Sequence, residues 1–124
     1  MKKYLAEMFG TMVLVLMGCG VAVSLSCNYA EPATVIGTAM AFGLSVVAMA
    51  YTIGGISGCH INPAITLGVF LSGKISGKDA VGYMVAQIVG AFIGSTLLYL
   101  LTQNAGLIGT GANDLQDAGV TVVG

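Results

Sequence analysis

The sequence predicts an all-α membrane protein with three transmembrane helices and one re-entrant half-helix. Of its 124 residues, 56% are hydrophobic and only 7% are charged, and the mean hydropathy is +0.95. Soluble domains carry about 25% charged residues, so this balance indicates a chain that is surrounded by lipid. Three uncharged stretches approach the roughly 20 residues that a membrane crossing requires: they are Met8 to Leu25, Pro32 to Ile53 and Ala80 to Leu101.

We expect the three spans at about residues 5–25, 33–53 and 80–102 of a single unit that covers 1–124. The first span also has features of a secretory signal, because Lys2 and Lys3 precede it and Leu16–Cys19 resembles a lipoprotein cleavage box. That interpretation predicts a soluble mature domain. It is disfavoured because two more apolar spans follow.

The third span has small residues at four-residue spacing, which predicts close helix packing. Helices associate in lipid through packing rather than through the hydrophobic effect, and small residues let their backbones approach. The row consists of Gly82, Ala86, Gly90 and Gly94. After this span, residues 103–124 are rich in Gly and polar side chains, and we expect them to form an extracellular loop.

The placement of the lysines predicts the orientation of the chain. All four lysines precede the first span or lie between the second and the third: Lys2, Lys3, Lys74 and Lys78. With three crossings these segments share one face, and positive charge favours the cytoplasmic face. The sequence therefore predicts a multi-pass protein of the plasma membrane with a cytoplasmic N-terminus and the end of this chain outside.

The half-helix is expected at about residues 62–71. Asn62 is a preferred N-cap residue, and Pro63 at the first helical position gives up an N–H that would be unpaired anyway. The apolar segment around them is too short to cross a bilayer. A helix that begins at membrane depth has to line a polar cavity, because unpaired backbone in lipid is costly. This segment is therefore a pore or binding-site candidate.

Three polar residues in or near the spans are further candidates, since such residues in membranes are commonly functional. Glu7 either reaches the headgroups or faces inward and accepts hydrogen bonds from the re-entrant loop. Gln87 lies about two turns into its span, where an inward hydrogen bond is favoured. His60, the only histidine, serves as a metal ligand, a proton relay or a loop brace, but a single histidine is poor evidence for a metal.

Other chemistry finds little support in the sequence. The cysteines (Cys19, Cys27 and Cys59) are odd in number and lack metal-ligand spacing, which favours free packed thiols. No nucleophile–base pair is apparent, so we expect no enzyme, no catalytic residue, no cofactor and no metal. The absence of a basic patch argues against a nucleic-acid partner.

The motifs of this chain resemble those of the N-terminal half of the aquaporins, the major intrinsic protein family, of the bacterial water-channel type. The resemblance covers essentially all 124 residues. It implies half of a six-helix, inverted-repeat fold in which two Asn-Pro-Ala half-helices meet at mid-membrane. The motifs are Ala6-Glu7-Met8-Phe9-Gly10-Thr11, Ala41-Phe42-Gly43-Leu44, the loop from Ser57 to Thr66, and Gly82-Tyr83 with Ala86-Gln87.

The resemblance also implies roles for individual residues. The Asn62 amide would donate to passing water while its side-chain oxygen caps the half-helix, and the preceding carbonyls would form a ladder of acceptors. Phe42 would line the selectivity constriction, where Phe is typical of the water-selective branch. The implied pore and selectivity residues are Asn62, Pro63, Ala64, Phe42, Gly58, Cys59, His60 and Ile61, with Glu7 and Gln87 as structural support of the loop.

The implied function is a channel that passes water down its gradient and excludes ions and protons, with small neutral solutes as further permeants. Its implied partners are water, lipid, a missing C-terminal half and, for full channels, the other copies of a homotetramer. The second Asn-Pro-Ala half-helix and the Arg of the constriction are absent from this sequence. Because half a pore would be open to lipid, we expect conduction only when the second half is supplied.

Three interpretations of the half-length pattern stay open. The apolar run Val120 to Val123 favours a partial chain of a six-span channel. A half-length protein that pairs with an inverted copy of itself is disfavoured by the one-sided lysines, since both orientations should then be nearly equal in energy. A non-conducting membrane scaffold or assembly subunit would use the glycine row for contacts.

Overall fold

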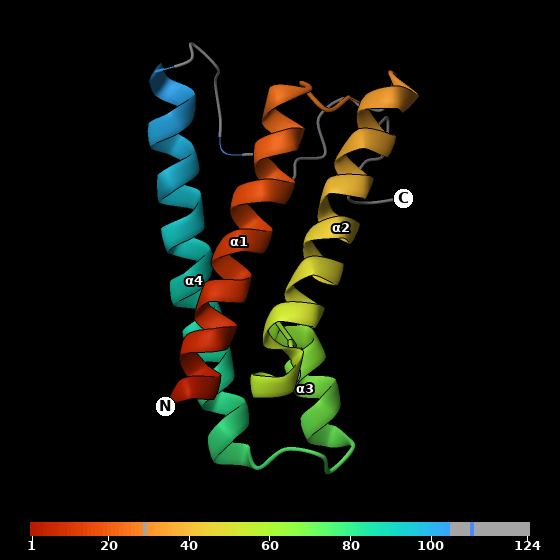
Figure 1. Ribbon diagram of the computed structural model, residues 1–124. Helices are drawn as coiled ribbons and strands as arrows, with labels where there is room; N and C mark the ends of the chain where they lie inside the picture. Colours follow the sequence, from red (N-terminus) through yellow and green to blue (C-terminus); the bar gives the residue numbers. More distant parts are fainter. Residues whose placement is uncertain (29, 105–109, 111–124) are drawn as a thin grey trace, which may run out of the picture.

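The computed structural model describes residues 1–28, 30–104 and 110, and in these residues the fold is entirely helical. Figure 1 shows the order of the elements: α1 (Lys2–Ser24), α2 (Pro32–Ser57), α3 (Pro63–Leu71) and α4 (Gly77–Asn104). The predicted fold class, three long helices and one short one without strands in the described residues, is confirmed.

Three of the helices are long and apolar enough to cross a membrane, namely α1, α2 and α4. The chain is therefore an integral membrane protein. The remaining helix, α3, has nine residues and is about 14 Å long at 1.5 Å per residue, so it cannot cross a hydrocarbon core of about 30 Å. In Figure 1, α3 runs back toward the end of the bundle at which α1 and α4 begin.

The observed helices differ from the expected ranges at their ends. α2 continues past residue 53 and its last residue is Ser57. The next residue, Gly58, has a φ of +89°, the left-handed conformation that terminates many helices. α4 begins at Gly77 rather than near residue 80 and includes residues 103 and 104, which were expected to be loop. Apart from residue 110, the rest of the expected extracellular loop lies outside the described residues.

The glycine row of α4 packs directly on α1. A Cβ at Gly94 would lie 2.6 Å from the carbonyl oxygen of Met12, and a Cβ at Gly90 would overlap the carbonyl of Met8. Only glycine leaves room for contact between the two backbones at these positions. α1 contacts α4 on one side and α2 on the other, so it forms the centre of the bundle (Figure 1).

The buried core is small and lies near the re-entrant segment. It consists of Ala6, Met49, Ile53 and Ile61, which join α1, α2 and the loop before α3. Most other large apolar side chains are exposed. In a bilayer such a surface meets lipid tails or further protein, so the exposure fits a membrane protein in which packing rather than hydrophobic burial holds the helices together.

Candidate functional site

The segment between α2 and α3 has an unusual backbone. Cys59 and Ile61 adopt φ values of +53° and +42°, and both are non-glycine residues in the left-handed region. This conformation is uncommon for residues with a side chain, and for a β-branched residue such as Ile61 it is an outlier. Strained backbone persists where surrounding contacts hold it in place, so the partners of this segment matter.

The N-terminus of α3 is capped by its own first side chain. The Asn62 Oδ1 accepts a hydrogen bond of 2.8 Å from the Ala64 N–H, and Pro63 occupies the first helical position. Asn62, Pro63 and Ala64 are exposed, and the Asn62 NH₂ donates to no partner among the described residues. The amide is therefore oriented by its oxygen while its two N–H donors stay available.

Glu7 of α1 is fully buried and holds the segment from inside the bundle. Its Oε1 accepts hydrogen bonds from the Ser57 hydroxyl (2.6 Å) and from the His60 N–H (2.9 Å). Its Oε2 accepts from the Ile61 N–H (2.6 Å) and from the Gln87 amide (2.7 Å). A carboxylate has about four acceptor positions, and all four are filled by donors. Glu7 thus turns inward rather than toward the headgroups.

Gln87 of α4 and Thr66 of α3 connect Glu7 to the half-helix. Both side chains are fully buried. The Gln87 amide also donates to the Thr66 hydroxyl over 3.0 Å, and the Thr66 hydroxyl lies 3.1 Å from both the Nδ1 of His60 and the carbonyl oxygen of Asn62. The network therefore runs without a break from α1 through α4 to the residue that caps α3.

Tyr83 braces the segment from a second point on α4. Its hydroxyl donates to the carbonyl oxygen of Ser57 over 2.8 Å, and its ring meets the His60 ring edge-on with centroids 5.1 Å apart. No individual role was predicted from the sequence for Ser57, Thr66 or Tyr83. A role for Tyr83 could have been inferred from its spacing to Gln87, because residues four apart share a face of a helix.

The main-chain N–H groups and the carbonyl oxygens that precede Asn62 differ in their partners. The Cys59 N–H donates to the half-buried Ser57 hydroxyl, and the N–H groups of His60 and Ile61 donate to the buried Glu7 carboxylate. In contrast, no hydrogen bond to the carbonyls of residues 58–61 occurs within the part of the chain that the structure describes. The three N–H groups are therefore paired within the described residues, and the four carbonyls are not.

Phe42 lies at another level of the molecule. It precedes Gly58 by 16 positions on α2, a separation of about 24 Å along the helix axis. Its ring is half-buried and packs on Gly18 of α1. The structure therefore joins Glu7, His60, Ile61, Asn62 and Gln87 in one network, and Phe42 does not belong to it.

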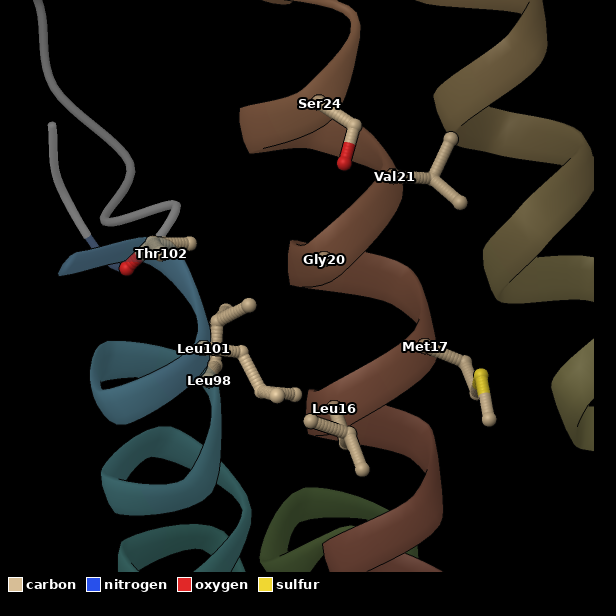
Figure 2. Close-up of a pocket in the computed structure, with 8 residues that line it drawn as sticks. All are labelled: Leu16, Met17, Gly20, Val21, Ser24, Leu98, Leu101 and Thr102. Atoms are coloured by element: carbon tan, nitrogen blue, oxygen red, sulfur yellow. The ribbon is translucent and has the colours of Figure 1, made fainter. Parts of the chain in front are cut away.

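No metal or cofactor site is apparent in the described residues. They contain no group of three or more His, Cys, Asp and Glu side chains placed to hold an ion, and the three thiols are free. An open apolar groove lies between α1 and α4, lined by Leu16, Met17, Gly20, Val21, Ser24, Leu98, Leu101 and Thr102 (Figure 2). It includes none of the residues predicted from the sequence.

Comparisons with known proteins agree on one family. The family model described as Major intrinsic protein matches residues 1–123. Among similar curated proteins is an Aquaporin Z of Rhodopseudomonas palustris, 48% identical over 103 residues, which are 83% of this chain and 43% of that protein. An Aquaporin Z of Bradyrhizobium diazoefficiens is 45% identical over 105 residues, 85% of this chain and 44% of the relative.

A third relative aligns over almost the whole chain. The Aquaporin Z of Brucella melitensis is 38% identical over 129 residues, which cover 99% of this chain and 57% of that protein. The chain thus spans about half the length of the curated relatives it matches.

Proposed function

This chain belongs to the major intrinsic protein family, and on that premise we propose that it forms one half of a transmembrane pore that passes water and excludes ions and protons. The observation that carries the proposal is the Asn62 amide, whose oxygen caps α3 while its NH₂ is exposed and unpaired among the described residues. Members of this family are channels rather than enzymes, and the curated relatives are named Aquaporin Z.

Water passage through a narrow tube requires replacement of the hydrogen bonds that water loses when it leaves the bulk. The Asn62 NH₂ supplies donors, and the free carbonyls of residues 58–61 supply acceptors that lead up to it. Glu7 supports this arrangement, because it binds the amides of His60 and Ile61 from inside the bundle and so fixes the backbone of the segment. Together the Asn62 donors and the carbonyl acceptors form a polar track along an otherwise apolar pore wall.

Exclusion of ions follows from the electrostatics of the half-helix. The N-terminus of a helix carries roughly half a positive charge, and α3 presents this end at Asn62. A positive end at the middle of a pore opposes cations and protons. A neutral amide adds donors there without adding the negative charge that would attract cations.

Phe42 lines the selectivity constriction in this proposal. The assignment rests on the family motif around Phe42, which lies about 24 Å along α2 from Gly58. An aromatic ring at that point narrows the bore toward the size of one water molecule.

A second half is needed to close the pore. Asn62, Pro63 and Ala64 are exposed at the tip of α3, and a polar tip facing lipid is unfavourable. We propose that an inverted half with its own half-helix covers this tip and that full channels assemble as homotetramers. The N-terminus and the α3–α4 connection lie at the same end of the bundle (Figure 1), so the four lysines share that end, which we assign to the cytoplasm.

The test is water flux through reconstituted liposomes measured by stopped-flow light scattering. The chain is joined to the second half of its Rhodopseudomonas palustris relative, and we call this fusion protein the completed channel. We expect the completed channel to raise water permeability well above that of protein-free liposomes and the 124-residue chain alone to leave it unchanged. If the completed channel gives no more water flux than protein-free liposomes, the proposal is contradicted. If the 124-residue chain alone conducts water, an inverted homodimer is favoured.

The role of Asn62 has its own test in the same system. Asn62→Asp places a negative charge where the helix end is positive, so we expect potassium or proton leakage to appear in liposomes of the completed channel. Asn28→Asp, an exposed change in the connection between α1 and α2, is the control and should leave leakage unchanged. Equal leakage in both variants would remove Asn62 from the pore.

A further inference from the structure

Gly18 of α1 and Phe42 of α2 are in unusually close contact. Gly18 is buried, and a Cβ at this position would lie 2.6 Å from the Cζ of the Phe42 ring, with two further ring carbons as near. Real carbon atoms pack at about 3.5–4.0 Å. The ring therefore lies directly on the backbone of α1, and only a residue without a side chain leaves room for it.

This contact is specific to one face of α1. Gly20, two positions later, faces α4 instead, where a Cβ would meet Leu98 Cδ1 at an ordinary distance of 3.6 Å. Figure 2 shows Leu98 and Leu101 of α4 beside this part of α1. Gly43, the neighbour of Phe42 on α2, has nothing within 4 Å of such an atom. Of these three glycines, only Gly18 is required by a neighbouring aromatic ring.

Phe42 is half-buried, so its ring is only partly covered by protein. One side rests on the main chain of α1 at Gly18. Closer to its N-terminus, at Met8 and Met12, α1 is packed against the glycines of α4. A fraction of the Phe42 surface is exposed in this chain. A ring that is displaced by an added side chain at Gly18 has to move away from the α1 backbone on which it rests.

We propose that Gly18 is a positioning residue for the selectivity constriction: it seats the Phe42 ring and so sets how far the ring projects into the bore. This inference rests on the proposed function, in which Phe42 lines the constriction. An added methyl group has to push the ring by about 1 Å to reach normal contact. Against a water molecule of about 1.4 Å radius, such a shift obstructs a single-file pore.

The experiment compares Gly18→Ala, Phe42→Ala and the double variant in the completed channel, with Gly20→Ala as the matched control. We expect Gly18→Ala to lower water permeability about tenfold, which is about 1.4 kcal/mol of barrier, while Gly20→Ala keeps the wild-type value. Phe42→Ala should raise glycerol flux. The double variant should behave like Phe42→Ala, because the added methyl then meets no ring.

Each outcome of this experiment either supports or overturns the inference about Gly18. A normal flux for Gly18→Ala, or a defect that persists without the ring, overturns the inference while leaving the proposed function intact. An unchanged selectivity for Phe42→Ala removes Phe42 from the constriction and overturns the inference with it, and a non-conducting completed channel overturns both proposals. If Gly18→Ala alone is not recovered from the membrane, recovery of the double variant with the flux of Phe42→Ala supports the inference, and loss of both variants refutes it.

Discussion

Replacing Glu7 by Gln preserves the shape of the side chain and removes its charge and one of its two acceptor oxygens. The carboxylate accepts four hydrogen bonds, two on each oxygen. A glutamine offers one oxygen and one NH₂ group, so two of the four donors then face another donor. The perturbation therefore tests whether the re-entrant segment depends on this single side chain.

The size of the destabilisation depends on which of the four donors can turn to another acceptor. The Ser57 hydroxyl and the Gln87 amide can rotate, but the main-chain N–H groups of His60 and Ile61 cannot. They sit on different oxygens of Glu7, so either placement of the new amide leaves one of them without an acceptor. A buried unsatisfied N–H costs about 1–3 kcal/mol, and each remaining bond loses about 1 kcal/mol without the charge.

One unsatisfied N–H and three weakened bonds sum to a loss of about 4–6 kcal/mol. A neutral side chain avoids the desolvation of a buried charge, which costs several kcal/mol, so we expect a net loss of about 2–4 kcal/mol. A change of about 2 kcal/mol shifts the folding equilibrium roughly 30-fold. It is measured as the free energy of unfolding of the 124-residue chain in mixed micelles of a mild detergent and dodecyl sulfate, followed by circular dichroism.

Glu31→Gln provides the matched control. Glu31 is exposed and its side chain makes no capping bond at the start of α2, so its free energy of unfolding should change by less than about 0.5 kcal/mol. If Glu7→Gln is no more destabilising than Glu31→Gln, the network does not hold the segment, and the role assigned to Glu7 is refuted.

Two further variants test the packing of α1 against α4. Gly90→Ala forces a methyl group onto the Met8 carbonyl and should destabilise the chain by about 1–3 kcal/mol in the same unfolding assay, whereas Gly54→Ala, with open space around it, should cost little; equal effects would show that the close approach is not needed. Asp79→Asn removes the ion pair with Lys3, which is 2.8 Å long and partly exposed. The unfolding midpoint should hardly move and any difference should vanish in high salt, so a large, salt-independent loss would contradict a surface role.

Local sequence chemistry was sufficient to predict the spans and the half-helix. The membrane class follows from composition, and the start of α3 follows from Asn62 and Pro63, which act on the backbone within two residues of themselves. Hydropathy is a sum over neighbouring residues, so it locates a span without reference to the rest of the chain. The ends of α2 and α4 were less well predicted, because a helix such as α2 continues past its apolar stretch until a terminating residue, here Gly58, stops it.

The direction of the Glu7 side chain was decided only by the tertiary structure. From the sequence, Glu7 could face the headgroups or the interior; its partners His60 and Gln87 are 53 and 80 residues away along the chain. The contact between Gly18 and Phe42 likewise depends on how α1 and α2 cross. Such contacts arise from the rotation and spacing of whole helices. The row that contains Gly90 and Gly94 predicts that α4 packs closely on a neighbour, but a pattern within one helix does not say which residues of which other helix it meets.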